Sequence, residues 1–136
     1  MKGKLYLIPT TLGESEINQV IPAFNTDLLN QINYFIVENI RTARRFLSKS
    51  KISSKIDDLV FFELNKHTPP EELASFIKPL LSGENIGLIS EAGCPAVADP
   101  GADIVALAHN SDIEIVPLVG PSSILLALMA SGFNGQ

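Results

Sequence analysis

The residues best suited to chemistry lie in one glycine- and proline-rich stretch, 86–101, which reads IGLISEAGCPAVADPG. An apolar run leads into a loop of small residues, and Asp99-Pro100-Gly101 then begins a helix. Ligands of open α/β sheets bind beyond the carboxyl ends of the strands, and small residues there let a ligand approach the backbone. A second unit of this kind, 113–123, ends in Gly-Pro-Ser-Ser. Together the two loops predict a small-molecule pocket.

Polar side chains at the strand ends offer two kinds of chemistry. Ser122 and Ser123 stand at the expected start of a helix, where they either cap the helix or hold a polar ligand group. Glu38 ends an apolar run on the side where the ligand should lie, so it is our candidate for a general base. The alternative for Glu38 is an ion pair with Arg41, three residues further on. The sequence leaves both choices open.

Several chemistries are excluded by what the chain lacks. Gly13 is the only glycine at the turn where a dinucleotide site needs Gly-x-Gly-x-x-Gly, and there is no Walker loop. Cys94 is the only cysteine, so it forms no intrachain disulfide, and no neighbouring His or Asn activates it as a nucleophile. His67 and His109 are too isolated for metal ligation, so we expect no metal.

Basic residues are concentrated in the window 41–55, which holds six of the ten Lys and Arg residues and no acid, although the net charge is −5. One interpretation of this window is a solvated helix face. The other is a patch that meets a phosphate backbone. The six residues are Arg41, Arg44, Arg45, Lys49, Lys51 and Lys55.

Short apolar runs predict the strands that position these residues. Such runs, typical of strands covered on both faces, occupy 4–8, 34–38, 59–64, 86–90 and 114–118. Helical patterns lie between them. The alternation predicts an α/β fold, with a mostly parallel sheet of about five strands and helices on both faces.

Helices are expected over 39–48 and 122–131, after Asp99-Pro100, and from Thr68 onward. For the last of these, Thr68 is the expected N-cap and Glu71 completes a capping box. We also expect Pro79 to bend its final turn and Gly83 to end it.

Length and composition suit one domain, since 46% of the 136 residues are hydrophobic. The apolar runs are too short to cross a bilayer, no signal peptide is evident, and a single cysteine suits a reducing compartment. We therefore expect a cytoplasmic protein without a membrane segment. The chain stops just after a helix stop signal at Gly132, so we expect 1–136 to be an N-terminal α/β domain cut from a longer two-domain protein.

Four motifs are spread over almost the whole chain: Pro9-Thr10-x-x-Gly13, Glu38-x-x-Arg41, Ser90-Glu-Ala-Gly-Cys-Pro-x-x-x-Asp99-Pro-Gly and Val116-Pro-Leu-x-Gly-Pro-Ser-Ser123. In order and spacing they resemble those of the tetrapyrrole methylase family. The resemblance is closest to the branch that methylates a ribose 2′-oxygen in small-subunit ribosomal RNA.

This resemblance implies an S-adenosylmethionine-dependent methyltransferase with the cofactor in a cleft between two α/β domains, and two chains paired as a homodimer. The present chain would supply one wall of that cleft. The cofactor-binding residues that the resemblance implies are Pro9, Ser90, Glu91, Ala92, Gly93, Cys94, Pro95, Val97, Pro121, Ser122 and Ser123. We also expect Arg41, Arg44 and Arg45 to hold phosphates of ribosomal RNA in the small subunit.

The resemblance implies that the loop 90–97 holds the methyl donor, and we call it the donor loop. The chain departs from that branch in this loop, at Glu91 and Cys94, in the first turn, and at Asn39-Ile40. The donor-loop changes keep charge and small size, whereas the others fall where an acceptor would be held. We infer that cofactor binding survives while the acceptor can differ. Besides an rRNA methyltransferase, the sequence leaves open a methyltransferase acting on a tetrapyrrole or other small molecule, and a non-catalytic cofactor-binding module.

Overall fold

Five parallel strands form one sheet in the order β3-β2-β4-β1-β5 in the computed structural model, which describes residues 1–52, 56–97 and 99–136. The strands are β1 (Leu5–Ile8), β2 (Tyr34–Val37), β3 (Val60–Glu63), β4 (Ile86–Ile89) and β5 (Ile115–Pro117). The predicted parallel α/β sheet is confirmed, and every strand agrees with its predicted range to within one residue at each end.

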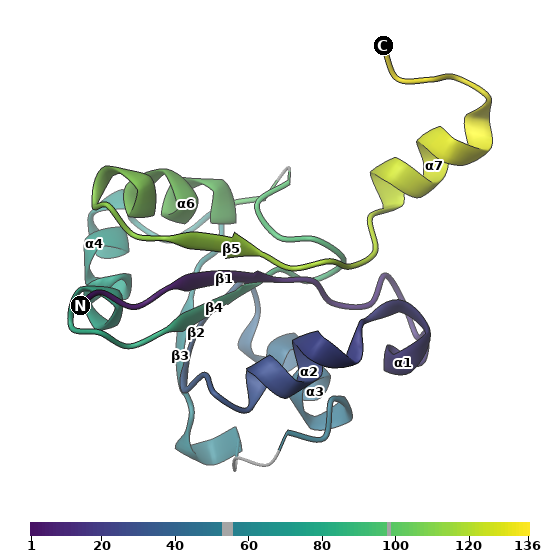
Figure 1. Ribbon diagram of the computed structural model, residues 1–136. Coiled ribbons are helices and arrows are strands. Elements are labelled where there is room, and N and C mark those ends of the chain that lie inside the picture. Colours follow the sequence, from purple (N-terminus) through teal and green to yellow (C-terminus); the bar gives the residue numbers. More distant parts are fainter. Residues whose placement is uncertain (53–55, 98) are drawn as a thin grey trace.

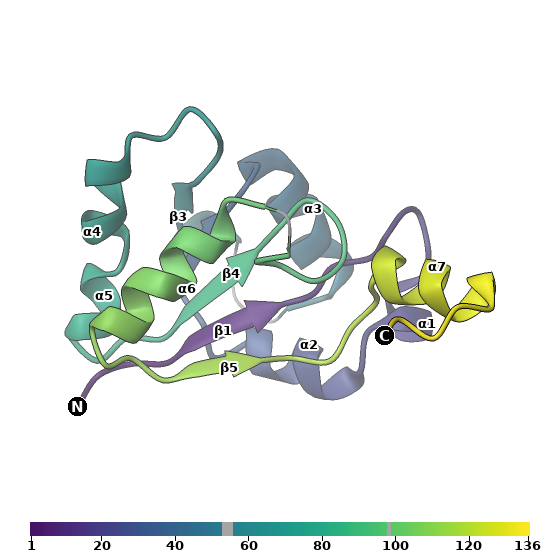
Figure 2. The same ribbon diagram turned by 90° about the horizontal axis from the view of Figure 1, so that it is seen from above.

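Helices cover both faces of this sheet (Figures 1 and 2). They are α1 (Ile17–Val20), α2 (Ala23–Leu29), α3 (Ile40–Lys49), α4 (Leu73–Phe76), α5 (Lys78–Leu81), α6 (Gly101–Asn110) and α7 (Ser123–Ser131), with 3₁₀ turns η1 (Ile56–Asp58) and η2 (Pro70–Glu72). The predicted helices after 39, 100 and 122 are confirmed. The helices over 17–29 were not predicted, since that segment lacks a clear apolar period.

Alternate side chains of the strands feed two separate cores. On one face Ile36 and Leu88 pack with residues of α4, α5 and α6 such as Ile104. On the other face Phe35 and Ile89 pack with residues of α2 and α3. Because successive strand residues point to opposite faces, a strand buried on both sides must be apolar throughout, and β4 is buried along its whole length.

The segment after Thr68 differs from the predicted single helix. The Thr68 hydroxyl accepts a hydrogen bond from Asn65 N and donates one to Glu63 O, so it belongs to the preceding turn and the predicted capping box is wrong. Pro79 has no N–H to give, and the segment is divided into η2, α4 and α5, with the break between the two α-helices at Ile77. Gly83 follows with φ +100°, which ends the helix as predicted.

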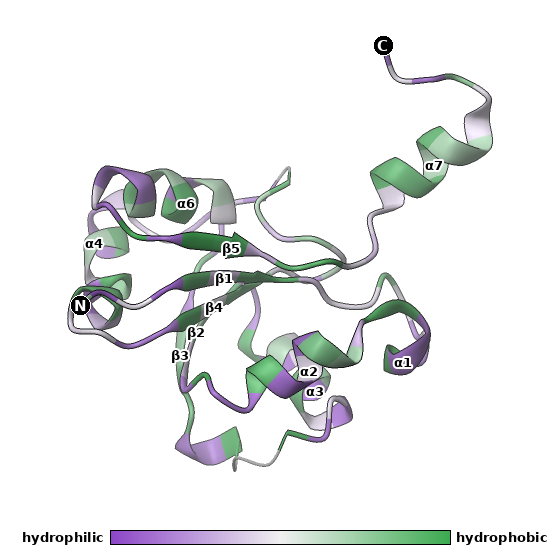
Figure 3. Cartoon of the chain, viewed as in Figure 1, coloured by the Kyte–Doolittle hydropathy of each residue, from purple (hydrophilic) through white to green (hydrophobic). Residues whose placement is uncertain are grey.

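Helix α7, at the end of the chain, projects away from the sheet and the helices that cover it (Figure 1). Ser122 caps it and Gly132 ends it in the left-handed conformation. It has no buried residue, although most of its side chains are apolar (Figure 3). A helix that is apolar on all sides is normally buried, so α7 is an unpartnered element of this chain.

Candidate active site

The loop after β4 lies at the point where the chain reverses its direction across the sheet. The chain leaves β4 through α6 on one face, whereas it leaves the neighbouring strands β1 and β2 through α2 and α3 on the other. Such a switch point opens a crevice beyond the carboxyl ends of the strands, where open α/β sheets bind ligands. The stretch 90–97, singled out by sequence, occupies this crevice.

Hydrogen bonds tie this loop to the ends of three other strands. Thr10 N, after β1, donates to Gly93 O at 3.0 Å. The Cys94 thiol donates to Pro121 O, after β5, with an S···O distance of 3.3 Å. Glu91 N donates to Glu38 Oε1, after β2, at 3.2 Å. The three distant motifs are therefore brought together into one loop cluster.

Two glycines allow the loops to approach each other closely. Gly93 has φ +69°, and a Cβ there would lie 3.1 Å from Pro121 O. A Cβ on Gly120 would lie 2.1 Å from Pro9 Cβ, so the turn after β5 rests directly on the end of β1. Larger residues at either position would separate the loops.

Asp99 fixes the far end of the donor loop. Its carboxylate accepts hydrogen bonds from Ala96 N at 3.0 Å and from Gly101 N, the first residue of α6, at 2.8 Å. Ala96 has φ +68°, an unfavourable conformation for a residue with a Cβ. Sequence reasoning assigned Asp99 only to the helix start. The contact with Ala96 depends on loop geometry that spacing alone does not show.

Asn25 was not singled out by sequence but also supports the cluster. It is 2% exposed in α2, and its Nδ2 donates to Val119 O at 2.8 Å. The amide thus ties α2 to the chain leaving β5. Helix α2 also contains Thr26 and Asp27, so the sequence gives no signal that separates Asn25 from its polar neighbours.

The implied cofactor-binding residues divide into a buried set and a solvent-facing set. Pro9, Ser90, Gly93 and Pro95 are buried and shape the loop from within; Cys94, Pro121 and Ser122 are half-buried; Glu91, Ala92, Val97 and Ser123 are exposed. The Pro9 ring packs against Gly120 and so supports the turn after β5 from below.

Ser122 and Glu38 each have a local structural role. The Ser122 hydroxyl accepts from Leu125 N at 3.4 Å, which is the capping role weighed from the sequence. Glu38 accepts the Glu91 N–H. The ion pairs among the described residues are Lys4–Glu114 and Arg44–Asp57, so the alternative pair of Glu38 with Arg41 is not formed there.

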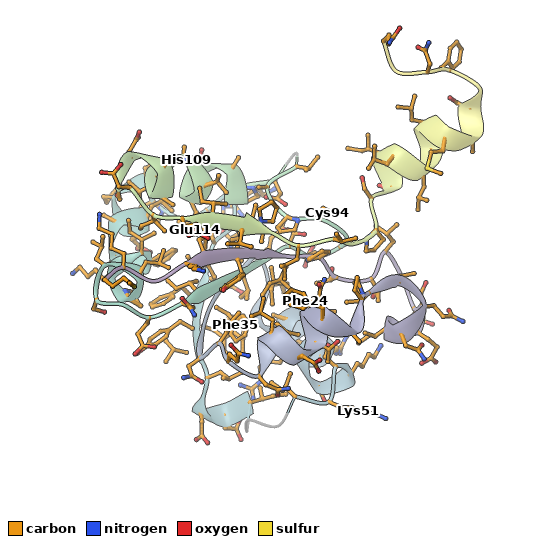
Figure 4. All side chains as sticks on the ribbon, viewed as in Figure 1. Phe24, Phe35, Lys51, Cys94, His109 and Glu114 are labelled. Carbon is orange, nitrogen blue, oxygen red and sulfur yellow. The ribbon has the colours of Figure 1, made fainter. Side chains whose placement is uncertain are left out.

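The Cys94 thiol lies at the end of the sheet from which α7 departs (Figure 4). Burial raises its pKa above the ordinary value, because the thiolate would be poorly solvated there. A protonated thiol that donates to a carbonyl is a weak nucleophile. Cys94 therefore acts here as a small bridging residue.

The hollow at this edge is small. It has a volume of about 10 Å³, the size of one water molecule, and its lining includes Glu38, Ser90, Pro95 and Asp99. This hollow is far too small for a cofactor, although the residues that line it include those of the loop singled out by sequence.

The predicted phosphate-binding arginines lie on α3, which begins directly after Glu38 and Asn39. Arg41 and Arg45 are exposed, and Arg44 forms an ion pair with Asp57 of η1. Lys49 and Lys51 are also exposed. Lys55 lies outside the described residues.

Within 1–52, 56–97 and 99–136, no three His, Cys, Asp or Glu side chains gather as metal ligands would, and both histidines are exposed. The helices described in those ranges are all too short or too polar to span a bilayer.

Fold and site together define the class: an α/β domain with a cluster of small-residue loops at the switch point of a parallel sheet, which is where open α/β sheets bind their ligands. No protein-family model matches the chain. It is similar to curated proteins named ribosomal RNA small subunit methyltransferase I. Identity is 33% over 129 residues with that of Vibrio cholerae, covering 94% of this chain and 42% of the relative.

Two further relatives carry the same name. Identity with the Streptococcus pyogenes serotype M6 protein is 34% over 134 residues, covering 98% of this chain and 44% of the relative. Identity with the Synechocystis protein is 29% over 130 residues, covering 96% of this chain and 44% of the relative. The chain thus spans less than half the length of these relatives.

Proposed function

We propose that this chain is the N-terminal half of an S-adenosylmethionine-dependent methyltransferase that modifies small-subunit ribosomal RNA. The observation that carries the proposal is the donor loop at the switch point, tied by hydrogen bonds to the turns after β1, β2 and β5. The relatives' shared name supports the substrate. A protein that modifies rRNA would work in the cytoplasm.

The residues of the donor loop fit a nucleoside cofactor. Gly93 keeps the backbone bare where the loops meet, and the exposed Val97 offers an apolar surface for a base. Glu91 offers a carboxylate and Ser123 a hydroxyl on the exposed side. The buried set, Pro9 and Pro95 among it, would hold these groups in place. S-adenosylmethionine, when bound, supplies a methyl group on an electrophilic sulfonium.

The chain's own part in the chemistry is alignment and proton removal. Positioning the acceptor against the methyl group contributes several kcal/mol. A ribose hydroxyl must also lose its proton, and a base at that atom contributes roughly 10²–10⁴-fold. We infer that Glu38 is this base, because its carboxylate already lies beside the donor loop at Glu91.

We infer that a second α/β domain, encoded downstream, supplies the other wall of the cleft and that the functional unit is a homodimer. The water-sized hollow on the present chain supports the first point, since one wall alone encloses no cofactor. The greater length of the relatives also supports it. The unpartnered apolar surface of α7 supports a contact with further protein.

Calorimetry with S-adenosylhomocysteine on the full-length polypeptide tests the cofactor site. Gly93→Ala should weaken binding by roughly 5- to 30-fold, the equivalent of forcing one L-residue into the left-handed region. Gly83→Ala is the matched control, because Gly83 also has positive φ but lies at the opposite end of β4. Equal affinity of wild type and Gly93→Ala, or no heat with wild type, contradicts the proposal.

Methyl incorporation into small-subunit rRNA from a strain lacking the gene tests the acceptor. Glu38→Gln keeps an oxygen for the Glu91 N–H but removes the base, so the methylation rate should fall by roughly 10²–10⁴-fold with S-adenosylhomocysteine affinity unchanged. Full activity of Glu38→Gln would reduce Glu38 to a positioning role. Transfer to a small molecule but not to rRNA would refute the proposed substrate.

A further inference from the structure

We propose that the α3 face beside this edge binds one unpaired ribonucleotide, with its base in a hollow floored by isoleucines and its flanking phosphates on arginines. The proposal rests on the proposed function, because it names RNA as the ligand. The hollow is open, has a volume of about 500 Å³, and is lined by Ile40, Arg41, Arg44, Arg45, Ser48 and Ile56.

The floor of the hollow is apolar and held in place from below. Ile40, in the first turn of α3, and Ile56, at the start of η1, are both half-buried and pack against the core on the α2–α3 face. Their outer surfaces remain available. Apolar surface ringed by cations suits a nucleobase better than it suits a bare phosphate, which needs hydrogen-bond donors on every side.

Arg44 differs from its neighbours because it is already paired. Its Nη2 lies 2.5 Å from Asp57 Oδ1, which links α3 to η1 across the hollow. The pair offsets part of the attraction of Arg44 for a phosphate, and together with the partial burial of Arg44 it restrains the planar guanidinium. A restrained guanidinium plane is a surface on which an unstacked base can lie.

Arg41 and Arg45 supply the uncompensated charge. Both side chains are exposed, and neither belongs to the ion pairs of the described residues. Helix α3 carries four cations and no acid, whereas the whole chain has a net charge of −5. A polyanion would therefore be attracted to this face in spite of the net negative charge of the chain.

The position of the hollow relates it to the candidate active site. Helix α3 begins two residues after Glu38, and Ile40 N is held by Glu63 Oε1 at the end of β3. A nucleotide on α3 would thus lie next to the strand end that also contacts the donor loop. The bound nucleotide would therefore be a neighbour of the nucleotide that accepts the methyl group. The RNA there must be single-stranded, because only an unpaired base can enter the hollow.

Fluorescence of a short single-stranded RNA containing 2-aminopurine, titrated with this chain at several salt concentrations, tests the proposal. Arg44→Lys keeps the charge but loses the planar group, so binding should weaken by roughly 5- to 150-fold at every salt concentration, with loss of the fluorescence change. Arg41→Gln and Arg45→Gln should each reduce the slope of log affinity against log salt by about 0.7.

Lys78→Gln is the matched control, because it removes one exposed cation from α5 on the other face of the sheet. It should change neither affinity nor slope, and each variant's unfolding midpoint should match that of wild type. Equal binding of duplex RNA or of an acidic polypeptide, or an unaffected Arg44→Lys variant, would overturn the nucleotide site. Calorimetry with S-adenosylhomocysteine is independent of these variants, so failure of the cofactor proposal is distinguishable.

Discussion

Helices α6 and α7 are almost equal in length and both follow a strand of the sheet, yet they have opposite environments. Helix α6 packs Ile104 and Ala108 into the core, where both are fully buried. Helix α7 buries nothing, and Met129 is 77% exposed. The comparison shows that capping and apolar content decide where a helix forms, but only the surrounding chain decides whether its side chains stabilise the fold.

The largest expected effect comes from shortening a buried side chain in α6. Ile104→Ala should lower the free energy of unfolding by about 2–5 kcal/mol, because it leaves a cavity among fully packed neighbours. Leu125→Ala in α7, where the side chain is 59% exposed, should change it by less than about 0.5 kcal/mol. Urea unfolding of the chain measures both, and equal losses would remove the contrast between the helices.

A smaller loss of stability is expected from substitutions at the glycines before and after α7, Gly120 and Gly132. Gly120→Ala places a Cβ against Pro9 and should destabilise the whole fold by about 1–3 kcal/mol. Gly132→Ala meets open space and suffers only from its φ of +85°, so it should shorten α7 without moving the global unfolding midpoint. Circular dichroism and urea unfolding together separate these outcomes, and a shared midpoint shift would show that α7 is coupled to the core.

Removing the N-caps of two helices sharpens the same contrast. Asn39 Oδ1 accepts from Thr42 N at 3.0 Å at the start of the packed helix α3. Asn39→Ala should lower global stability by about 1 kcal/mol. Ser122→Ala should reduce only the helical signal of α7, because that helix contributes no burial. Thermal unfolding monitored by circular dichroism distinguishes a shifted midpoint from a smaller starting signal.

The smallest effect concerns pH. The pKa of Cys94 is raised in the folded chain, so above the ordinary thiol pKa the folded state holds a proton that the unfolded state has released. The contribution of this group to the free energy of unfolding is therefore fully present at neutral pH, and it declines as the pH rises past the ordinary thiol pKa. Cys94→Ser should flatten the decline, and alkylation of Cys94 should be slower in the folded than in the urea-unfolded chain. Equal alkylation rates would refute the burial of the thiol.

Strand positions were predictable because each strand is a short apolar run bounded by polar or turn residues, and this information is local. The N-cap at Thr68 was predicted wrongly because the partners of its hydroxyl, Asn65 and Glu63, are set by the turn before it, which the sequence pattern does not show. Strand order was not predictable, since parallel pairing joins residues far apart in sequence, such as Leu5 and Ile86.

The candidate site follows the same division. The loops themselves were found from glycine, proline and small residues. Their mutual contacts were not, because the bonds from Glu91 to Glu38 and from Asn25 to Val119 span 53 and 94 positions. The small volume of the hollow beside Glu38 was not predictable either, since loop composition shows where a ligand could approach but not how much space the loops leave.

Strand β5 has a further consequence for how copies of this chain behave in solution. It lies at the margin of the sheet, where Leu5 N bonds Glu114 O and Leu118 N bonds Leu7 O. The backbone of the intervening Pro117 therefore faces outward, and it has no N–H to donate. A strand from another chain could not form a continuous hydrogen-bond ladder with β5, so this edge of the sheet disfavours fibril-like extension.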